Sequence, residues 1–188
     1  VVTAVGEGVT SLRVGQRVAY AGVPGAYAEV RNAKAERLVA LPDEVDDQTA
    51  ASVMLKGMTA EFLLRRCRPV GPGTSVLIHA AAARHLGARV IGAVGRAEKA
   101  ALAKPICDDV VVLSEGPWIE KVKALTGGRG VDVVYDSVGH DTLASSLDVL
   151  APRGTLVSFG QSSGKPPLLD IGALGGPHVP LRRWARDA

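Results

Sequence analysis

Two apolar runs stand very close together in this chain. Residues 75–81 and 88–94 both have the pattern of fully buried strands in a parallel sheet, and only residues 82–87 separate them. Neighbouring parallel strands need a crossover of about a dozen residues or more, which is usually a helix. Six residues cannot supply that crossover. The sequence therefore predicts that a turn and the first part of its helix are missing, at the place where such sheets bind a dinucleotide pyrophosphate.

The rest of the chain has the pattern of two domains. Short β-like runs alternate with turns up to about residue 42, which is typical of antiparallel, barrel-like structure. Helical spacing then extends from Asp46 to a break at Pro69, and alternating strands and helices follow. We expect an α/β fold with a Rossmann-type, doubly wound parallel sheet at 46–170, preceded by a partial β-barrel at 1–45 and followed by a divergent tail at 171–188.

The expected elements are short. In the first domain we expect strands at 1–6, 15–20, 25–30 and 37–42. In the second we expect strands near 75–81, 88–94, 109–112, 132–136 and 155–159, and helices near 97–104, 117–126 and 140–150.

Composition excludes several classes of function. The 188 residues carry a net charge of only +3, and the basic clusters at 65–68 and 182–186 are more typical of a solvated helix end and a tail than of a nucleic-acid surface. No apolar run approaches the roughly 18 residues of a membrane span, and no signal segment opens the chain, so we expect a cytoplasmic protein. Cys67 and Cys107 lie far apart and the histidines lack ligand spacing, so we expect no metal.

The predicted strand ends carry residues suited to a nucleotide. Ala81 and Ala82 end the first strand and would let a backbone approach a phosphate, although such residues also serve plain packing. Gly95, Arg96 and Lys99 follow the second strand without an acidic residue, which favours the 2′-phosphate of NADP over the ribose hydroxyl of NAD. Taken alone, this segment is equally well interpreted as two surface cations at a helix start. The fourth and fifth strands end in Ser137 and in Phe159-Gly160-Gln161-Ser162.

Asp136 is the one acidic residue at these strand ends that invites a catalytic interpretation. No second titratable group accompanies it in the sequence, so we predict that it caps the turn that follows. We therefore name no catalytic residue.

Seven motifs occur in order and at compatible spacing. They are Gly15-Gln16-Arg17-Val18-Ala19-Tyr20, Gly25-Ala26-Tyr27-Ala28-Glu29, Leu55-Lys56-Gly57-Met58-Thr59-Ala60, Val76-Leu77-Ile78-His79-Ala80-Ala81-Ala82, Leu125-Thr126-Gly127-Gly128-Arg129-Gly130-Val131-Asp132, Tyr135-Asp136-Ser137-Val138-Gly139 and Ser158-Phe159-Gly160-Gln161-Ser162-Ser163-Gly164. Together they resemble the zinc-free quinone oxidoreductases of the medium-chain dehydrogenase/reductase superfamily. The resemblance implies a GroES-like barrel joined to a Rossmann domain, NADPH as cofactor, a quinone substrate reduced by hydride or electron transfer, and a homodimer.

The resemblance also implies site residues. It puts Thr59 near the nicotinamide, Ala81 and Ala82 at the pyrophosphate turn, and Gly95 and Lys99, helped by Arg96, at the 2′-phosphate. Along the cofactor groove it puts Ser137, Phe159, Gly160, Gln161 and Ser162.

Three departures from the family leave other interpretations open. The chain starts well inside the family's catalytic domain, the Gly-Gly-Val-Gly element after Ala82 is absent, and the similarity ends after Gly176. We thus expect a fragment, in which the glycine turn was either never present or was left out of this sequence. A real deletion would shorten the covering helix by about three turns and expose apolar strand surface. The alternatives to a quinone reductase are a non-catalytic nucleotide-binding remnant that at most oligomerises, and an enoyl-thioester reductase.

Overall fold

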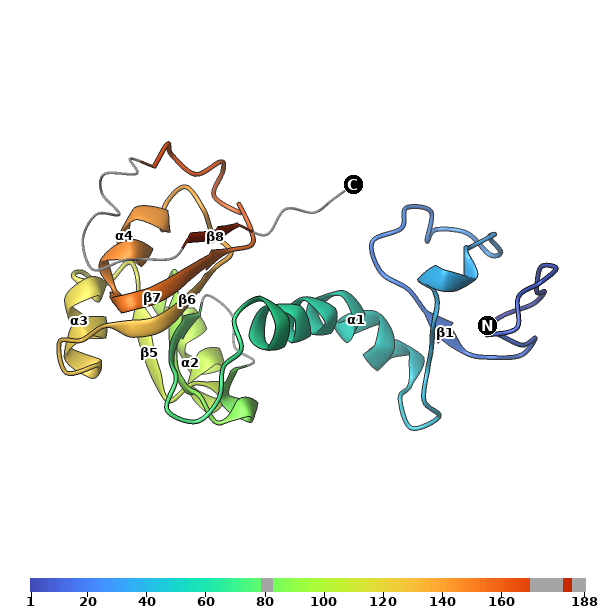
Figure 1. The fold of residues 1–188 in the computed structure, drawn as a ribbon, viewed down its shortest axis with the longest axis horizontal. Coiled ribbons are helices and arrows are strands. Elements are labelled where there is room, and N and C mark those ends of the chain that lie inside the picture. Colours follow the sequence, from blue (N-terminus) through green and yellow to red (C-terminus); the bar gives the residue numbers. More distant parts are fainter. Residues whose placement is uncertain (79–82, 170–180, 184–188) are drawn as a thin grey trace. The chain divides into compact units, whose positions relative to one another are not determined.

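The chain divides into two compact units, Val1–Glu61 and Phe62–Ala188. Figure 1 shows them in a computed structural model that describes residues 1–78, 83–169 and 181–183. The predicted division at residues 45 and 170 stays a prediction. Within the described residues, no helix is long and apolar enough to cross a membrane.

The N-terminal unit contains little regular structure. Strands β1 (Val18–Ala19) and β2 (Val39–Ala40) pair antiparallel, and a 3₁₀ turn, η1 (Ala35–Arg37), precedes β2. The strands predicted at 1–6 and 25–30 are wrong, because these residues form no ladder in the structure. The physical reason is the lack of a core, since Ala50 is the one buried residue within 1–61. Strands are stabilised by side chains that pack across a pair and against a buried face.

Helix α1 (Asp47–Glu61) closes this unit and begins where the sequence predicts. Asp46 caps it, because its carboxylate accepts hydrogen bonds from the N–H and the hydroxyl of Thr49 at 2.8 and 2.7 Å. These bonds, above all that from the backbone N–H, lower the pKa of Asp46. Arg17, which precedes β1, donates to Asp47 at 2.7 Å and to the Val45 carbonyl at 2.6 Å. One side chain thus ties the strand pair to the helix start.

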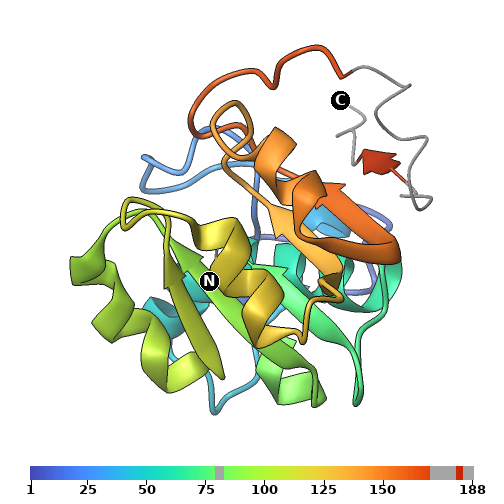
Figure 2. The same cartoon turned by 90° about the vertical axis from the view of Figure 1, so that its left-hand side faces the viewer.

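The C-terminal unit is a six-stranded parallel sheet with the order β5-β4-β3-β6-β7-β8 (Figures 1 and 2). Its strands are β3 (Ser75–Ile78), β4 (Arg89–Val94), β5 (Asp109–Val112), β6 (Val131–Asp136), β7 (Leu150–Ser158) and β8 (Leu181–Arg183). Numbered from β3, this is the order 3-2-1-4-5-6 of a doubly wound dinucleotide-binding sheet. The predicted fold class is confirmed. Strand β8, which lies in the predicted tail, was not expected.

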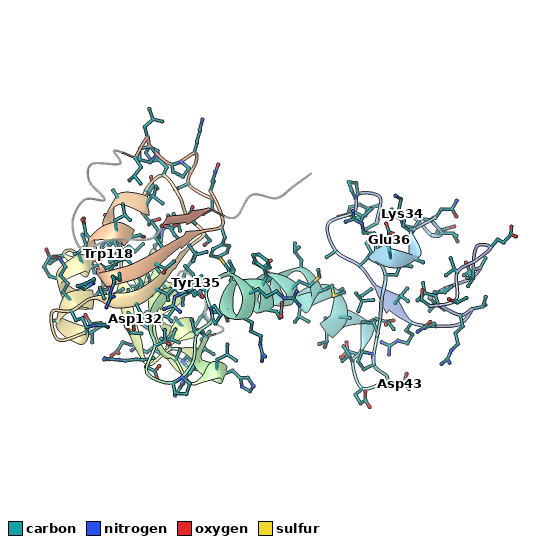
Figure 3. All side chains as sticks on the ribbon, in the orientation of Figure 1. Lys34, Glu36, Asp43, Trp118, Asp132 and Tyr135 are labelled. Atoms are coloured by element: carbon teal, nitrogen blue, oxygen red, sulfur yellow. The ribbon has the colours of Figure 1, made fainter. Side chains whose placement is uncertain are left out.

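Short helices connect the strands. They are η2 (Phe62–Cys67, π-helical), η3 (Ala83–Leu86), η4 (Ala97–Lys99), α2 (Ala100–Ala103), η5 (Lys104–Ile106), α3 (Trp118–Leu125) and α4 (Leu143–Asp148). On one face of the sheet Leu77, Ile91 and Val134 form the core with α3 and α4. Trp118 at the start of α3 packs against this core (Figure 3). Helix α4 ends earlier than predicted, because β7 already pairs with β6 at Leu150.

On the other face of the sheet, the residues with which the chain enters this unit cover Tyr135. Tyr135 of β6 is fully buried, and its hydroxyl donates to the carbonyls of Leu63 and Arg68 at 3.1 and 2.7 Å (Figure 3). Burial raises the pKa of the Tyr135 phenol. The π-helical turn η2 is thus fixed to the sheet, and its Leu63 and Leu64 are buried there.

The short link between the first two strands of the sheet is compatible with parallel pairing, which corrects our first expectation. Strands β3 and β4 pair in parallel with Ser75 opposite Arg89. The strand β3 has only four residues, about 13 Å at 3.3 Å per residue. The four-residue 3₁₀ helix η3 spans about 8 Å, at 2.0 Å per residue, which is more than half of the length of β3 that the crossover must span. Residues 79–81 of the longer predicted strand lie outside the described residues.

The expected exposure of apolar strand surface is also wrong for the described residues. Val76 and Leu77 of β3, like Val90 and Ile91 of β4, have no exposed surface. Ala83 of η3 is fully buried as well. The shortened crossover therefore still contributes to the core, and η2 adds further cover on the face that carries Tyr135.

Candidate functional site

The loops after β6 and β7 form one packed surface at the carboxyl edge of the sheet. The Phe159 N–H donates to the Asp136 carbonyl at 2.9 Å, and the Ser162 N–H donates to the Ser137 carbonyl at 3.2 Å. A Cβ on Gly160 would lie 2.5 Å from the Ser137 carbonyl oxygen, so only glycine permits this approach. The structure thus brings together Ser137 and the predicted 159–162 stretch.

The two loops differ in how far they face solvent. Ser137, Phe159 and Gly160 are half-buried, whereas Gln161 and Ser162 are exposed. The surface therefore presents hydroxyl, amide and main-chain groups together with a half-buried aromatic ring. Such a mixture can hold a flat polar ligand by hydrogen bonds and apolar contact.

Asp136 is an anchor for this surface. Its carboxylate is fully buried and accepts bonds from the Val138 and Gly139 N–H groups at 2.8 and 3.0 Å. The hydroxyls of Thr142 and Ser146 donate to it at 2.8 and 2.9 Å. With its oxygens occupied, the side chain caps the turn as predicted and is not free to act as an acid. The sequence analysis did not identify Thr142 and Ser146 as partners of Asp136. Their only signal in the sequence is a hydroxyl side chain six and ten positions after this aspartate.

A second polar network fixes the start of β6 to β3. Asp132 accepts bonds from the N–H and the hydroxyl of Ser75, both at 2.8 Å, and from Arg129 at 2.7 Å. Burial opposes the charge of Asp132, but the bonds from Arg129 and Ser75 outweigh it and lower the pKa of this carboxyl. This network lies at the amino end of β6, opposite the loop surface.

The end of β4 carries an exposed cationic segment. Gly95, Arg96 and Lys99 are all exposed, and the Lys99 N–H donates to the Arg96 carbonyl at 3.1 Å. Within the described part of the chain, neither cationic side chain has a hydrogen bond or an ion pair. A Cβ on Gly95 would meet nothing within 4 Å. Packing therefore does not require glycine there, and the space above it is open.

These two parts lie at one edge of the sheet. Strands β4 and β6 flank β3 and run parallel to it, so their carboxyl ends point the same way. The strand order reverses between β3 and β6, which is where open α/β sheets bind ligands. Arg96 and Lys99 thus stand on one side of this switch point and Ser137 on the other.

Three further residues are predicted for the site. Ala81 and Ala82 fall outside the described residues. Thr59 belongs to α1 of the N-terminal unit, where its hydroxyl donates to the Leu55 carbonyl at 2.9 Å. Its role near a nicotinamide stays a prediction.

The described residues fit a dinucleotide only in part. The free cations and open space after β4 suit a 2′-phosphate, and the loops after β6 and β7 suit a flat ring. At the pyrophosphate position, the sequence after Ile78 has no glycine before Gly87, and the described helix is the four-residue η3. In residues 1–78, 83–169 and 181–183, no cluster of three or more His, Cys, Asp or Glu side chains could hold a metal.

Known proteins resemble the chain along most of its length. A family profile described as zinc-binding dehydrogenase matches residues 77–179. A 2-haloacrylate reductase of a Burkholderia species is 48% identical over 178 residues, which cover 87% of this chain and 54% of that protein. A quinone oxidoreductase of Pseudomonas aeruginosa is 45% identical over 185 residues, which cover 92% and 57%.

A solved structure shares the fold. The quinone oxidoreductase of Escherichia coli complexed with NADPH superposes with a TM-score of 0.91 at 38% identity, covering 97% of this chain and 60% of that one. The chain thus spans little more than half the length of these relatives. By this family profile, its sheet order and these identities, the chain belongs to the family described as zinc-binding dehydrogenases, within the medium-chain dehydrogenase/reductase superfamily.

Proposed function

We propose that this chain carries the NADPH-binding part of an oxidoreductase that reduces quinones. The observation that carries the proposal is the end of β4, where Gly95 leaves open space, Arg96 and Lys99 are unpaired among the described residues, and the acidic residue of the segment, Glu98, comes only after the first cation. An Asp or Glu at this position would select the ribose hydroxyl of NAD, whereas cations select a 2′-phosphate. The relative of solved structure binds NADPH.

The protein's part in such a reaction is positioning. NADPH, when bound, supplies the hydride. The half-buried Phe159 and the loop that is held by hydrogen bonds to Asp136 would orient the cofactor against the carboxyl ends of the strands. The Ser137 hydroxyl would donate or accept a hydrogen bond at the edge of the cofactor. Thr59 is proposed for the nicotinamide end, and Ala81 and Ala82 for the pyrophosphate. A homodimer, which the family resemblance suggests, belongs to the same proposal.

The cofactor proposal is tested by calorimetric titration of the chain with NADPH and NADH. We expect NADPH to bind and NADH to bind at least tenfold more weakly, because a charge-assisted hydrogen bond contributes about 1.5–3 kcal/mol. Lys99→Ala should weaken the binding of NADPH and leave the affinity for NADH unchanged. Equal affinities for the two nucleotides, or no binding of either, would refute the proposal.

A second substrate class has its own support. The relative with 48% identity is a 2-haloacrylate reductase, which acts on an activated alkene. We propose a quinone as the substrate class better supported by the number of relatives, because several relatives at 42–45% identity are quinone oxidoreductases. NADPH oxidation with a benzoquinone, with 2-chloroacrylate and with an enoyl thioester separates these classes. Turnover of the alkenes alone would overturn the quinone assignment.

A further inference from the structure

The N-terminal unit contains a cavity of its own, with a volume of about 370 Å³. It lies between the loop that follows β1 and the turn η1, and its walls combine apolar with cationic side chains. Pockets that hold small organic molecules begin at about 300 Å³, so the cavity is large enough for one. Its lining includes Tyr20, Val23, Arg31, Lys34, Arg37 and Leu38.

Arg31 is held in one orientation at the wall of this cavity. Its Nη1 donates to the Tyr20 hydroxyl at 3.1 Å and to the Pro24 carbonyl at 2.8 Å. The guanidinium carbon lies 5.0 Å from the centre of the Tyr20 ring, which is a cation–π distance. The Nε of the same guanidinium is buried and has no hydrogen-bond partner among the described residues. Buried donors normally have an acceptor, so this Nε points to one that the described chain does not supply.

Two further cations line the cavity from the two ends of η1. The Arg37 N–H donates to the Lys34 carbonyl at 3.0 Å, which closes this 3₁₀ turn (Figure 3). Both side chains are exposed, and in the described part of the chain neither has a hydrogen bond or an ion pair. Their charges are therefore available to a ligand.

The charge that surrounds the cavity is positive on balance. Among the described residues that line it, none is acidic. Glu36, which stands between the two cations in the sequence, lines a second hollow with Thr10, and Lys34 borders both hollows. The half-buried Val23 and Leu38 add an apolar wall.

We propose that the cavity between β1 and η1 binds a small phosphate monoester with an apolar body. Lys34 and Arg37 contact the phosphate from the solvent side, the phosphate supplies the acceptor that the Arg31 Nε lacks, and the apolar wall contacts the body. A phosphate monoester carries close to two negative charges at pH 7, so three cations favour it over a carboxylate. The site shares no residue with the proposed nucleotide site and goes beyond the proposed function.

The test is calorimetric titration of the whole chain with phenyl phosphate, benzoate and phenol. We expect phenyl phosphate to bind at least about fivefold more tightly than benzoate, and phenol to show no binding at the same concentrations. Replacing Lys34 and Arg37 together by alanine should weaken phenyl phosphate at least about tenfold. Arg13→Ala removes an exposed cation of the same unit that does not line the cavity, and it should change nothing. Urea unfolding shows that each variant is folded.

The outcomes separate this inference from the proposed function, because phenyl phosphate can also meet the cations after β4. Binding that Lys99→Ala abolishes and the double variant leaves intact overturns the inference and leaves the nucleotide site standing. Binding that the double variant abolishes and Lys99→Ala leaves intact supports the inference, whether or not NADPH binds. No binding of phenyl phosphate, equal binding of benzoate, or an equal loss in Arg13→Ala overturns the inference.

Discussion

Replacing Asp136 tests whether this buried carboxylate is a structural anchor. Alanine there leaves the Val138 and Gly139 N–H groups and two hydroxyls without their acceptor. Each lost bond to a charged group costs about 1.5–3 kcal/mol, but hydroxyls can rotate and the loop can admit water, so only part of the sum is realised. We expect Asp136→Ala to lower the free energy of unfolding by about 3–5 kcal/mol.

Asparagine should be tolerated better at the same position. Its amide oxygen can still accept from the two N–H groups, and its NH₂ group can donate to the hydroxyls of Thr142 and Ser146, which then act as acceptors. Only the extra strength of charge-assisted bonds is lost, and we expect a decrease of about 1–2 kcal/mol. The measurement is urea unfolding followed by circular dichroism and tryptophan fluorescence.

The control for this pair is Asp141→Asn. Asp141 belongs to the same loop but its side chain is 68% exposed, so we expect a change within about 0.5 kcal/mol. Equal losses for the alanine and asparagine variants of Asp136 would refute the network as the source of stability. An Asp136→Asn protein of unchanged stability that has lost NADPH oxidation would instead assign the carboxyl a chemical role.

Three further changes test other parts of the structure. Tyr135→Phe removes a hydroxyl that donates to two carbonyls and should lower the free energy of unfolding by about 1–2 kcal/mol in urea, and no loss would contradict the observed bonds. Gly160→Ala places a Cβ 2.5 Å from a carbonyl oxygen and should lower the free energy of unfolding by about 1–3 kcal/mol. Gly95→Ala, where a Cβ meets nothing, should leave the free energy of unfolding unchanged. Equal effects of the two substitutions would refute the packing argument. The folded pKa of Asp132 is lowered, so its contribution to stability is complete above the unfolded value of about 3.9 and is lost as the pH falls through the folded value. Asp132→Asn should reduce the loss of stability in acid, and an unchanged acid dependence would count against the Arg129 and Ser75 bonds.

The sheet could be predicted from the sequence because its strands are buried on both faces. The run Val90-Ile91-Gly92-Ala93 is buried in β4, a strand with a neighbour on each side, and such runs are typical of parallel strands. Helix α3 was equally predictable from its spacing and from Pro117 before it. The capping role of Asp136 was predicted because no second titratable group accompanies it at the strand ends, and its hydrogen bonds confirm it.

Other features could not be predicted because they depend on distant partners. The runs at 1–6 and 25–30 alternate like strands, but within the N-terminal unit they have no buried face to pack against. Strand β8 lies in a segment without an apolar run, and it exists through its pairing with β7, Leu181 standing opposite Leu156. The closeness of Gly160 to Ser137 depends on two loops that are far apart in the sequence.

The length of β3 explains why a shortened crossover changes the chemistry of the site more than the fold. A crossover must return the chain over the length of one strand, and β3 is about 13 Å long, so a few 3₁₀ residues supply much of the distance. The requirement of a dozen residues applies to longer strands that carry a full helix. An anion site, by contrast, needs glycine for close approach and several aligned N–H groups at a helix start. A crossover of this length therefore preserves the order β4-β3-β6 of the sheet, while its described part, the four-residue η3, provides no such helix start.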